Sequence, residues 1–217
     1  MKIRLSELRQ LIREALEDEY TDEDLRADSI LFGKLAKEFF KTLKGPSKFR
    51  DTVKMHWVSS EEDALKFLEG NVSGEVSANI LPRGSAVSRL SWDWGEAGLQ
   101  VDGQVTLYCA GDMFTGTEST WGSGEKFPWL DGMFWDFPEN FDDVFERGVS
   151  KEEKIQILNE LGFEFDPPTE VDTHNEGLVK DPVVISIYIP GDKKEKYSKL
   201  IEKARERSIP VHLNLKA

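Results

Sequence analysis

The stretch Val183-Val-Ile-Ser-Ile-Tyr-Ile189 decides the fold class of this chain, because β-branched residues make up most of it, as is typical of strands. A helix is expected after it, over about Lys193–Ser208, and a last strand over Ile209–Leu215. This ending of strand, helix and strand predicts a domain in which helices pack on a sheet.

Capping signals place three more helices earlier in the chain. The first covers about residues 22–44 and is closed by Gly45-Pro46. The second runs from Ser59, which forms a capping box with Glu62, to Gly70. The third runs from Ser150, which forms a capping box with Glu153, through Leu161. Each boundary is a local prediction that depends on a few neighbouring residues.

The segment between the second and third of these helices has the pattern of strands. Candidates are Val72–Leu81, Ala86–Trp92, Leu99–Val101 and Gln104–Ala110. Asp102-Gly103 between the last two predicts a tight hairpin. Residues 111–148 show no clear period. The order of elements is typical of an α+β protein rather than of regular βαβ alternation.

Composition bounds the class of protein further. The chain has 217 residues, of which 39% are hydrophobic and 32% charged, and a single cysteine, Cys109. One cysteine excludes an intramolecular disulfide, and no stretch approaches the roughly 18 apolar residues of a membrane span. We therefore expect a cytoplasmic protein without a membrane segment. Cys109 is expected to be a small buried hydrophobe.

The net charge of −13 is concentrated in one segment. Asp131–Asp172 holds 13 acidic and three basic residues, which makes nucleic-acid binding through this face unfavourable. The segment also contains many aromatic residues. A solvated, solubilising surface and an interface for a basic partner protein both remain open.

The first 20 residues differ from the rest of the chain. Leu5, Leu8, Ile12 and Leu16 recur at helical spacing beside several basic residues, and an acidic run follows. Residues 1–20 are therefore expected to form an amphipathic leader or docking helix, and residues 21–217 a single α+β domain.

Short motifs along the domain resemble the ADP-ribosyltransferase-fold proteins of phages and bacteria. They are His56-Trp-Val-Ser-Ser60 with the helix that follows, Ser85-Ala-Val-Ser-Arg-Leu-Ser-Trp-Asp93, the strand Gln104–Ala110 with Gly111-Asp112, Asn175-Glu-Gly-Leu-Val179, and Ser208-Ile-Pro-Val211. The resemblance covers about residues 53–215. It implies a mixed, mainly antiparallel split sheet with flanking helices, which would hold NAD as co-substrate in a cleft.

The resemblance also implies roles for individual residues. His56 would grip the adenosine ribose, and Ser88 would support the nicotinamide ribose. Glu176 would hydrogen-bond the ribose and stabilise the positive charge that develops when nicotinamide leaves. The implied catalytic residues are Glu176 and His56, the implied cofactor-binding residues are His56, Trp57, Ser88 and Arg89, and no metal is implied.

Two departures from the family pattern leave the activity open. The family's glycine after the histidine is Trp57 here, and the glutamate motif contains one glutamate rather than two. The chain is thus expected to be either an active transferase that modifies a host protein or a relative that keeps the fold without the activity.

The leader carries a second resemblance, to segments that phage prohead proteases cleave. Leu5-Ser-Glu7 and Ile12-Arg-Glu14 are similar to their hydrophobic-x-Glu sites. This implies a phage protein of the host cytoplasm, or one packaged in the virion. The alternative is a non-catalytic phage structural or interaction protein that binds a basic partner through its acidic, aromatic-rich face.

A third class is a metal-dependent hydrolase or nuclease. It would use the acids Asp131, Asp136, Asp142 and Asp143, although their spacing lacks the alternation and central glycine of an EF-hand loop.

Overall fold

The computed structural model describes residues 36–70, 72, 74–87, 95–110, 148–160, 163–172 and 175–215. The chain falls into two compact units, one comprising Met1–Phe39 and Gly111–Glu164 and the other Phe40–Ala110 and Phe165–Ala217. The second unit contains the sheet.

The sheet has five strands in the order β2-β1-β3-β4-β5. Their bounds are β1 Val53–Val58, β2 Glu75–Leu81, β3 Ala97–Cys109, β4 Glu176–Pro190 and β5 Val211–Leu215. All pairings are antiparallel except that of β4 with β5. Because β2 also pairs with β4, strands β1, β2, β4 and β3 are hydrogen-bonded in a closed circuit. The expectation of an α+β protein with a mainly antiparallel sheet is confirmed.

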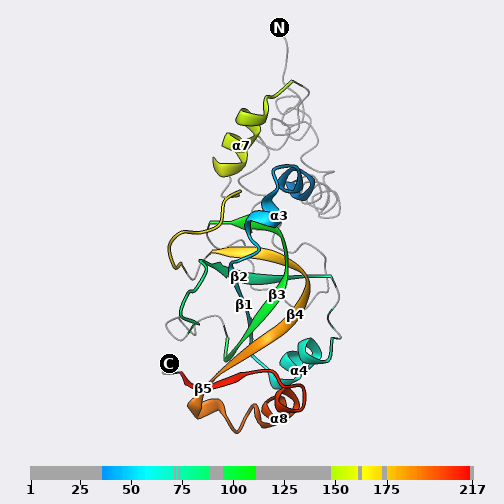
Figure 1. The fold of residues 1–217 in the computed structure, drawn as a ribbon, viewed down its shortest axis with the longest axis vertical. Helices are drawn as coiled ribbons and strands as arrows, with labels where there is room; N and C mark the ends of the chain where they lie inside the picture. Colours follow the sequence, from blue (N-terminus) through cyan, green and yellow to red (C-terminus); the bar gives the residue numbers. More distant parts are fainter. Residues whose placement is uncertain are drawn as a thin grey trace, which may run out of the picture. The chain divides into compact units, whose positions relative to one another are not determined.

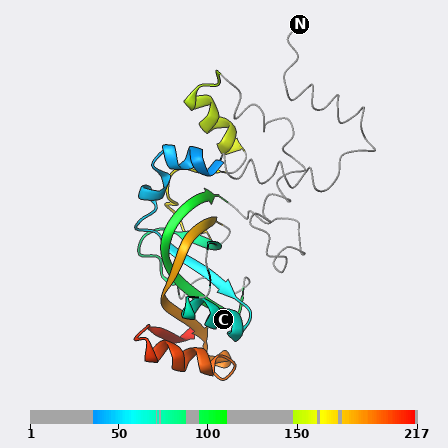
Figure 2. The same ribbon diagram turned by 90° about the vertical axis from the view of Figure 1, so that its right-hand side faces the viewer.

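Strands β3 and β4 are long and curve together, as Figures 1 and 2 show. The predicted hairpin at Asp102-Gly103 is wrong, because β3 runs through both residues and pairs with β4 on either side of them. The Asp102 carboxylate accepts a hydrogen bond from the Gly103 N–H at 2.8 Å. Gly103 has a φ of 155°, and a Cβ there would lie 2.6 Å from Val179. The Asp-Gly pair therefore forms an irregularity inside a strand rather than a chain reversal.

Helix α4, Glu61–Glu69, begins one residue later than expected. The predicted cap of Ser59 with Glu62 is wrong: the Ser60 hydroxyl accepts from the Asp63 N–H at 3.1 Å and donates to the Asp63 carboxylate at 2.7 Å. The predicted end is confirmed, since Gly70 has the left-handed conformation of a helix C-cap, with φ 74°.

Helix α8, Ser198–Glu206, lies beside α4 (Figure 1). Each helix caps the other. The Glu61 carboxylate accepts from the Leu200 N–H in the first turn of α8, at 3.0 Å, and the Arg207 guanidinium donates to the Leu68 carbonyl in the last turn of α4. Each charge has the sign that its helix end favours.

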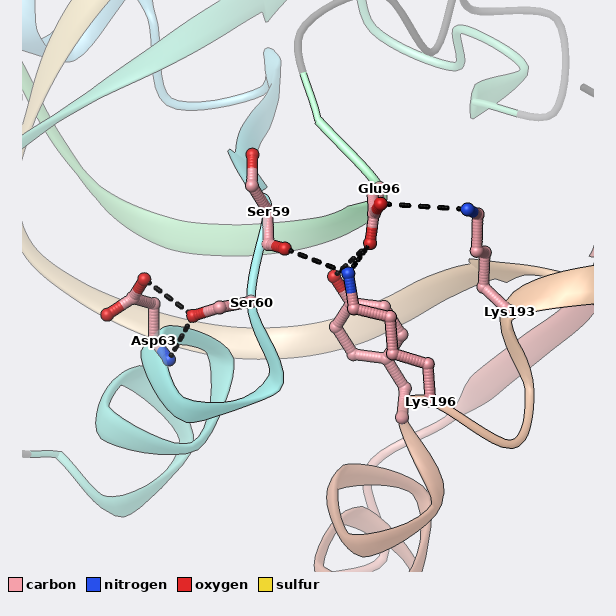
Figure 3. Close-up of polar contacts among 7 residues, drawn as sticks. Ser59, Ser60, Asp63, Glu96, Lys193 and Lys196 are labelled. Carbon is pink, nitrogen blue, oxygen red and sulfur yellow. Dashed lines mark hydrogen bonds and ion pairs between the residues drawn. The ribbon is translucent and has the colours of Figure 1, made fainter.

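A cluster of polar contacts joins the start of α8 to the sheet (Figure 3). The Lys196 ammonium binds the Glu96 carboxylate and donates to the Ser59 carbonyl at 3.3 Å. Lys193 lies 3.6 Å from the same carboxylate. The Tyr197 hydroxyl also donates to this carboxylate, at 3.4 Å. Burial, followed by the charge of Glu96, raises the pKa of Tyr197. The cluster thus connects the residue before β3 with the residues that precede both helices.

Residues 36–42 are helical, and a short helix α3, Gly45–Lys48, follows them. Gly45 was expected to close the preceding helix, but Lys44 takes the left-handed conformation, with φ 60°, and Gly45 opens α3. The Phe40 ring leaves no room for a side chain at position 45, because a Cβ on Gly45 would lie 2.5 Å from the ring.

In the other unit, helix α7 spans Lys151–Glu160. The predicted capping box is confirmed: the Ser150 hydroxyl accepts from the Glu153 N–H at 3.2 Å, and the Glu153 carboxylate accepts from the Ser150 N–H at 2.9 Å. Across the described residues of both units, no helix has the length and apolar character to cross a membrane.

Candidate functional site

Glu176 opens strand β4 and is 94% buried, with 6% of its surface exposed. It lies opposite Asn79 of β2 on one side and opposite Cys109 of β3 on the other. Residues directly opposite in a sheet share a face, so the amide, the carboxylate and the thiol lie on one surface. We call this surface the Glu176 face.

Ser77 holds the Glu176 carboxylate. Its hydroxyl donates to Glu176 Oε1 at 3.1 Å, across the pair of strands β2 and β4. Hydrogen bonds to a charged acceptor are stronger than neutral ones, so this contact restricts the rotation of the carboxylate. Ser77 and Glu176 are 99 residues apart in the sequence.

Asn79 and Trp57 extend the same face toward β1. The Trp57 indole N–H donates to Asn79 Oδ1, and Asn79 Nδ2 donates to the Asn175 carbonyl at 3.4 Å. Gly98 lies opposite Trp57, and a Cβ on it would approach the indole ring to 2.8 Å. The missing side chain at position 98 therefore leaves room for the indole to lie over β3.

A further polar group lies on this face near the other end of the sheet. The Tyr188 hydroxyl donates to Gln100 Oε1 at 3.1 Å, and the Tyr188 ring stacks on His212 with centroids 4.6 Å apart. Ser186, opposite Gln100, is 7% exposed, and its hydroxyl has no hydrogen-bond partner among the residues that the structure describes. The face thus carries both aromatic rings and neutral hydrogen-bonding groups.

His56 points to the opposite side of β1 from Trp57, because neighbouring residues of a strand alternate between faces. Its Nδ1 lies 2.7 Å from the Ser77 carbonyl oxygen, and its ring packs on Phe67 of α4 with centroids 4.4 Å apart. Since a carbonyl only accepts, Nδ1 carries the hydrogen. Burial lowers the pKa of His56, against the opposing effects of the Ser77 hydrogen bond and the Asp63 charge. The imidazole is therefore neutral at neutral pH.

In the structure, the two implied catalytic residues, His56 and Glu176, both contact Ser77. His56 bonds the backbone carbonyl of Ser77 and Glu176 bonds its hydroxyl, from opposite faces of the sheet. Trp57 donates to Asn79, the residue that lies opposite Glu176 in the pairing of β2 with β4. Ser88 and Arg89 lie outside the described residues.

Sequence reasoning missed Ser77 and Asn79. They alternate with Val76, Ala78 and Ile80 in β2, so their signal was period-two polarity within an otherwise apolar strand. Glu176 was expected ahead of a strand at Val183, whereas it is the first residue of a longer one. That longer strand is what places Glu176 between β2 and β3.

The acids Asp131, Asp136, Asp142 and Asp143, the aromatic cluster around them and the leader at residues 1–20 all lie outside the described residues. In the described part of the chain, no three histidine, cysteine or acidic side chains gather in a way that would hold a metal ion.

Comparisons with protein-family models, with curated proteins and with solved structures found no match to this chain.

Proposed function

We propose that the chain is an ADP-ribosyltransferase-like protein of phage type, which binds NAD on the Glu176 face and transfers ADP-ribose to a host protein. The observation that carries the proposal is the Ser77 hydroxyl bonded to the buried Glu176 carboxylate, with Asn79 opposite that glutamate. The motif residues that carry the sequence resemblance supply the class of reaction.

The chemistry requires a carboxylate held in advance of the reaction. Loss of nicotinamide leaves positive charge on the ribose carbon, and a preorganised negative group stabilises that charge without reorganising. A glutamate fixed by a neighbouring hydroxyl and shielded from water fits this need, because electrostatic attraction is stronger where water is excluded.

The remainder of the Glu176 face suits a ligand with planar rings and hydroxyl groups. Trp57 offers an indole surface, and Asn79, Gln100 and Ser186 are neutral donors and acceptors. Such a mixture of aromatic and sparse polar groups is typical of small-molecule sites.

The phage and host part of the proposal rests on residues 1–20 and their likeness to packaging leaders. In this proposal the protein acts in the host cytoplasm and is packaged in the virion. The intact mass of the protein from native particles checks it, since removal of the leader would shorten the chain by a defined mass.

The enzymatic proposal is tested by transfer of labelled ADP-ribose from NAD and by calorimetric titration with NAD. Glu176→Gln keeps the size of the side chain and removes its charge, so we expect turnover to fall about 10²–10³-fold. The matched control is Glu202→Gln, an exposed acid on α8, which should leave turnover unchanged. No heat of NAD binding at millimolar concentration by the wild-type chain would reject the proposal.

A further inference from the structure

The neutral imidazole of His56 has one N–H, and it donates this N–H to the protein backbone. Strands β1 and β2 pair from Val53 opposite Leu81 to Met55 opposite Asn79. Ser77 lies two residues beyond Asn79 in β2, and its carbonyl oxygen is 2.7 Å from Nδ1 of His56. The His56 side chain therefore links β1 to β2 just beyond the last backbone pair of these strands.

The imidazole is held rigidly in this position. Phe67 packs against the ring with 35° between the planes, and only 8% of the residue surface is exposed. The ring lies between α4 and β2, on the side of the sheet away from Trp57 and Asn79. In the part of the chain that the structure describes, the contact of the imidazole toward the Glu176 face is its hydrogen bond with the Ser77 carbonyl.

We propose that His56 is a positioning residue that orients the Ser77 hydroxyl, and through it the Glu176 carboxylate, rather than a residue that contacts the bound ligand. The inference about catalysis rests on the proposed function, whereas the link from His56 to Glu176 does not. It differs from the ribose-binding role that the sequence resemblance implies for His56.

The geometry of Ser77 explains how the effect travels. The carbonyl and the hydroxyl belong to one residue, so a shift of the carbonyl when His56 is lost also moves the Cβ that carries the hydroxyl. Small displacements of a catalytic group, up to about 1 Å, cost up to about 10²-fold in rate. Loss of His56 should therefore lower kcat and leave KM nearly unchanged, because the affected contact acts on the reacting centre.

The test that needs no activity is the carbon-13 chemical shift of the Glu176 carboxyl carbon at fixed pH, in protein labelled at glutamate and assigned with Glu176→Gln. We expect His56→Leu to move this signal. His56→Asn, whose side-chain N–H occupies nearly the place of Nδ1–H, should restore most of the wild-type position. The control, Glu202→Gln at an exposed position of α8, should leave the signal in place.

A double-mutant comparison shows whether the effect passes through Ser77. Ser77→Ala removes the hydroxyl and keeps the carbonyl, so adding His56→Leu to it should move the Glu176 signal no further. A second full-sized shift in the Ser77→Ala background, or no shift in folded His56→Leu, would overturn the proposal. If His56→Leu does not fold, His56→Gln replaces it, because its N–H lies one bond farther out and it should move the signal more than His56→Asn.

Kinetics separate this inference from the proposed function. If the wild type turns over NAD, His56→Leu should lower kcat about tenfold or more with KM within about twofold, and His56→Asn should recover most of the loss. A rise in KM at unchanged kcat would mean that His56 contacts the ligand, and would refute the positioning role. If the wild type does not use NAD, the proposed function fails, and the carboxyl signal alone decides whether His56 positions Glu176.

Discussion

Replacing Gly177 by alanine should destabilise the sheet beside Glu176. Gly177 lies opposite Ala78 of β2 and Tyr108 of β3, in the middle of three paired strands. An added Cβ would lie 2.7 Å from Cγ1 of Ile80 and 2.9 Å from the Leu107 carbonyl oxygen. The Ile80 side chain can rotate, but the carbonyl oxygen belongs to β3 and moves only if the strand moves.

The magnitude follows from two opposing effects. Overpacking a well-packed region costs about 1–3 kcal/mol, and contact with backbone places this site toward the upper end. Alanine also lowers the entropy of the unfolded chain, which stabilises the native state by about 0.4–1 kcal/mol. The expected loss in the free energy of unfolding is therefore about 2 kcal/mol, a change of about 30-fold in the ratio of folded to unfolded protein.

Urea unfolding followed by tryptophan fluorescence measures this loss. Gly70→Ala is the comparison, since a Cβ there would meet nothing within 4 Å and its cost arises only from the φ of 74°. Adding Ile80→Ala to Gly177→Ala should relieve part of the crowding, so the two substitutions should be less destabilising together than the sum of each alone. A Gly177→Ala protein within about 0.5 kcal/mol of wild type, or strict additivity with Ile80→Ala, would refute the reasoning.

Three further predictions concern pH and helix ends. Burial lowers the pKa of His56 in the native state below its value of about 6.5 in the unfolded chain. The free energy of unfolding should therefore be retained above pH 6.5 and fall as the pH drops below it, by at most about 1.4 kcal/mol per pH unit. Denaturation of the wild type at pH 4–8 should show this dependence on pH, and denaturation of His56→Phe should lack it. Arg207→Ala removes the cation at the Leu68 carbonyl and should cost about 1–2 kcal/mol in thermal unfolding, whereas Arg207→Lys should cost less. Ser150→Ala should cost about 1 kcal/mol and raise amide hydrogen exchange in the first turn of α7, while Ser150→Asp should retain the cap; equal exchange in all three proteins would contradict the capping box.

Local signals predicted the features that depend on a few adjacent residues. The Ser150 capping box and the end of α4 at Gly70 are set by hydrogen bonds within one turn and by a left-handed backbone position. The strand at Val183–Ile189 was also predicted, because β-branched residues favour extended backbone wherever the strand finds its partners.

Local signals failed where distant strands compete with them. Asp102-Gly103 has the sequence of a hairpin, but pairing of both flanks with β4 keeps β3 extended. Likewise, the strand was expected to begin at Val183, but it begins at Glu176, and Leu178 and Val179 are buried because β2 and β3 lie on either side of them. The stabilisation from long-range pairing exceeds the small local preferences of two or three residues.

By itself the sequence determined the α+β class, the acidic charge, the capped start of α7 and the end of α4 at Gly70, because composition and short-range hydrogen bonds need no knowledge of distant residues. Only the tertiary structure decided that Ser77 lies between His56 and Glu176, since strands far apart in the chain pair in one register. Register is set by packing over the whole sheet, and a slip of one residue would turn Glu176 to the other face.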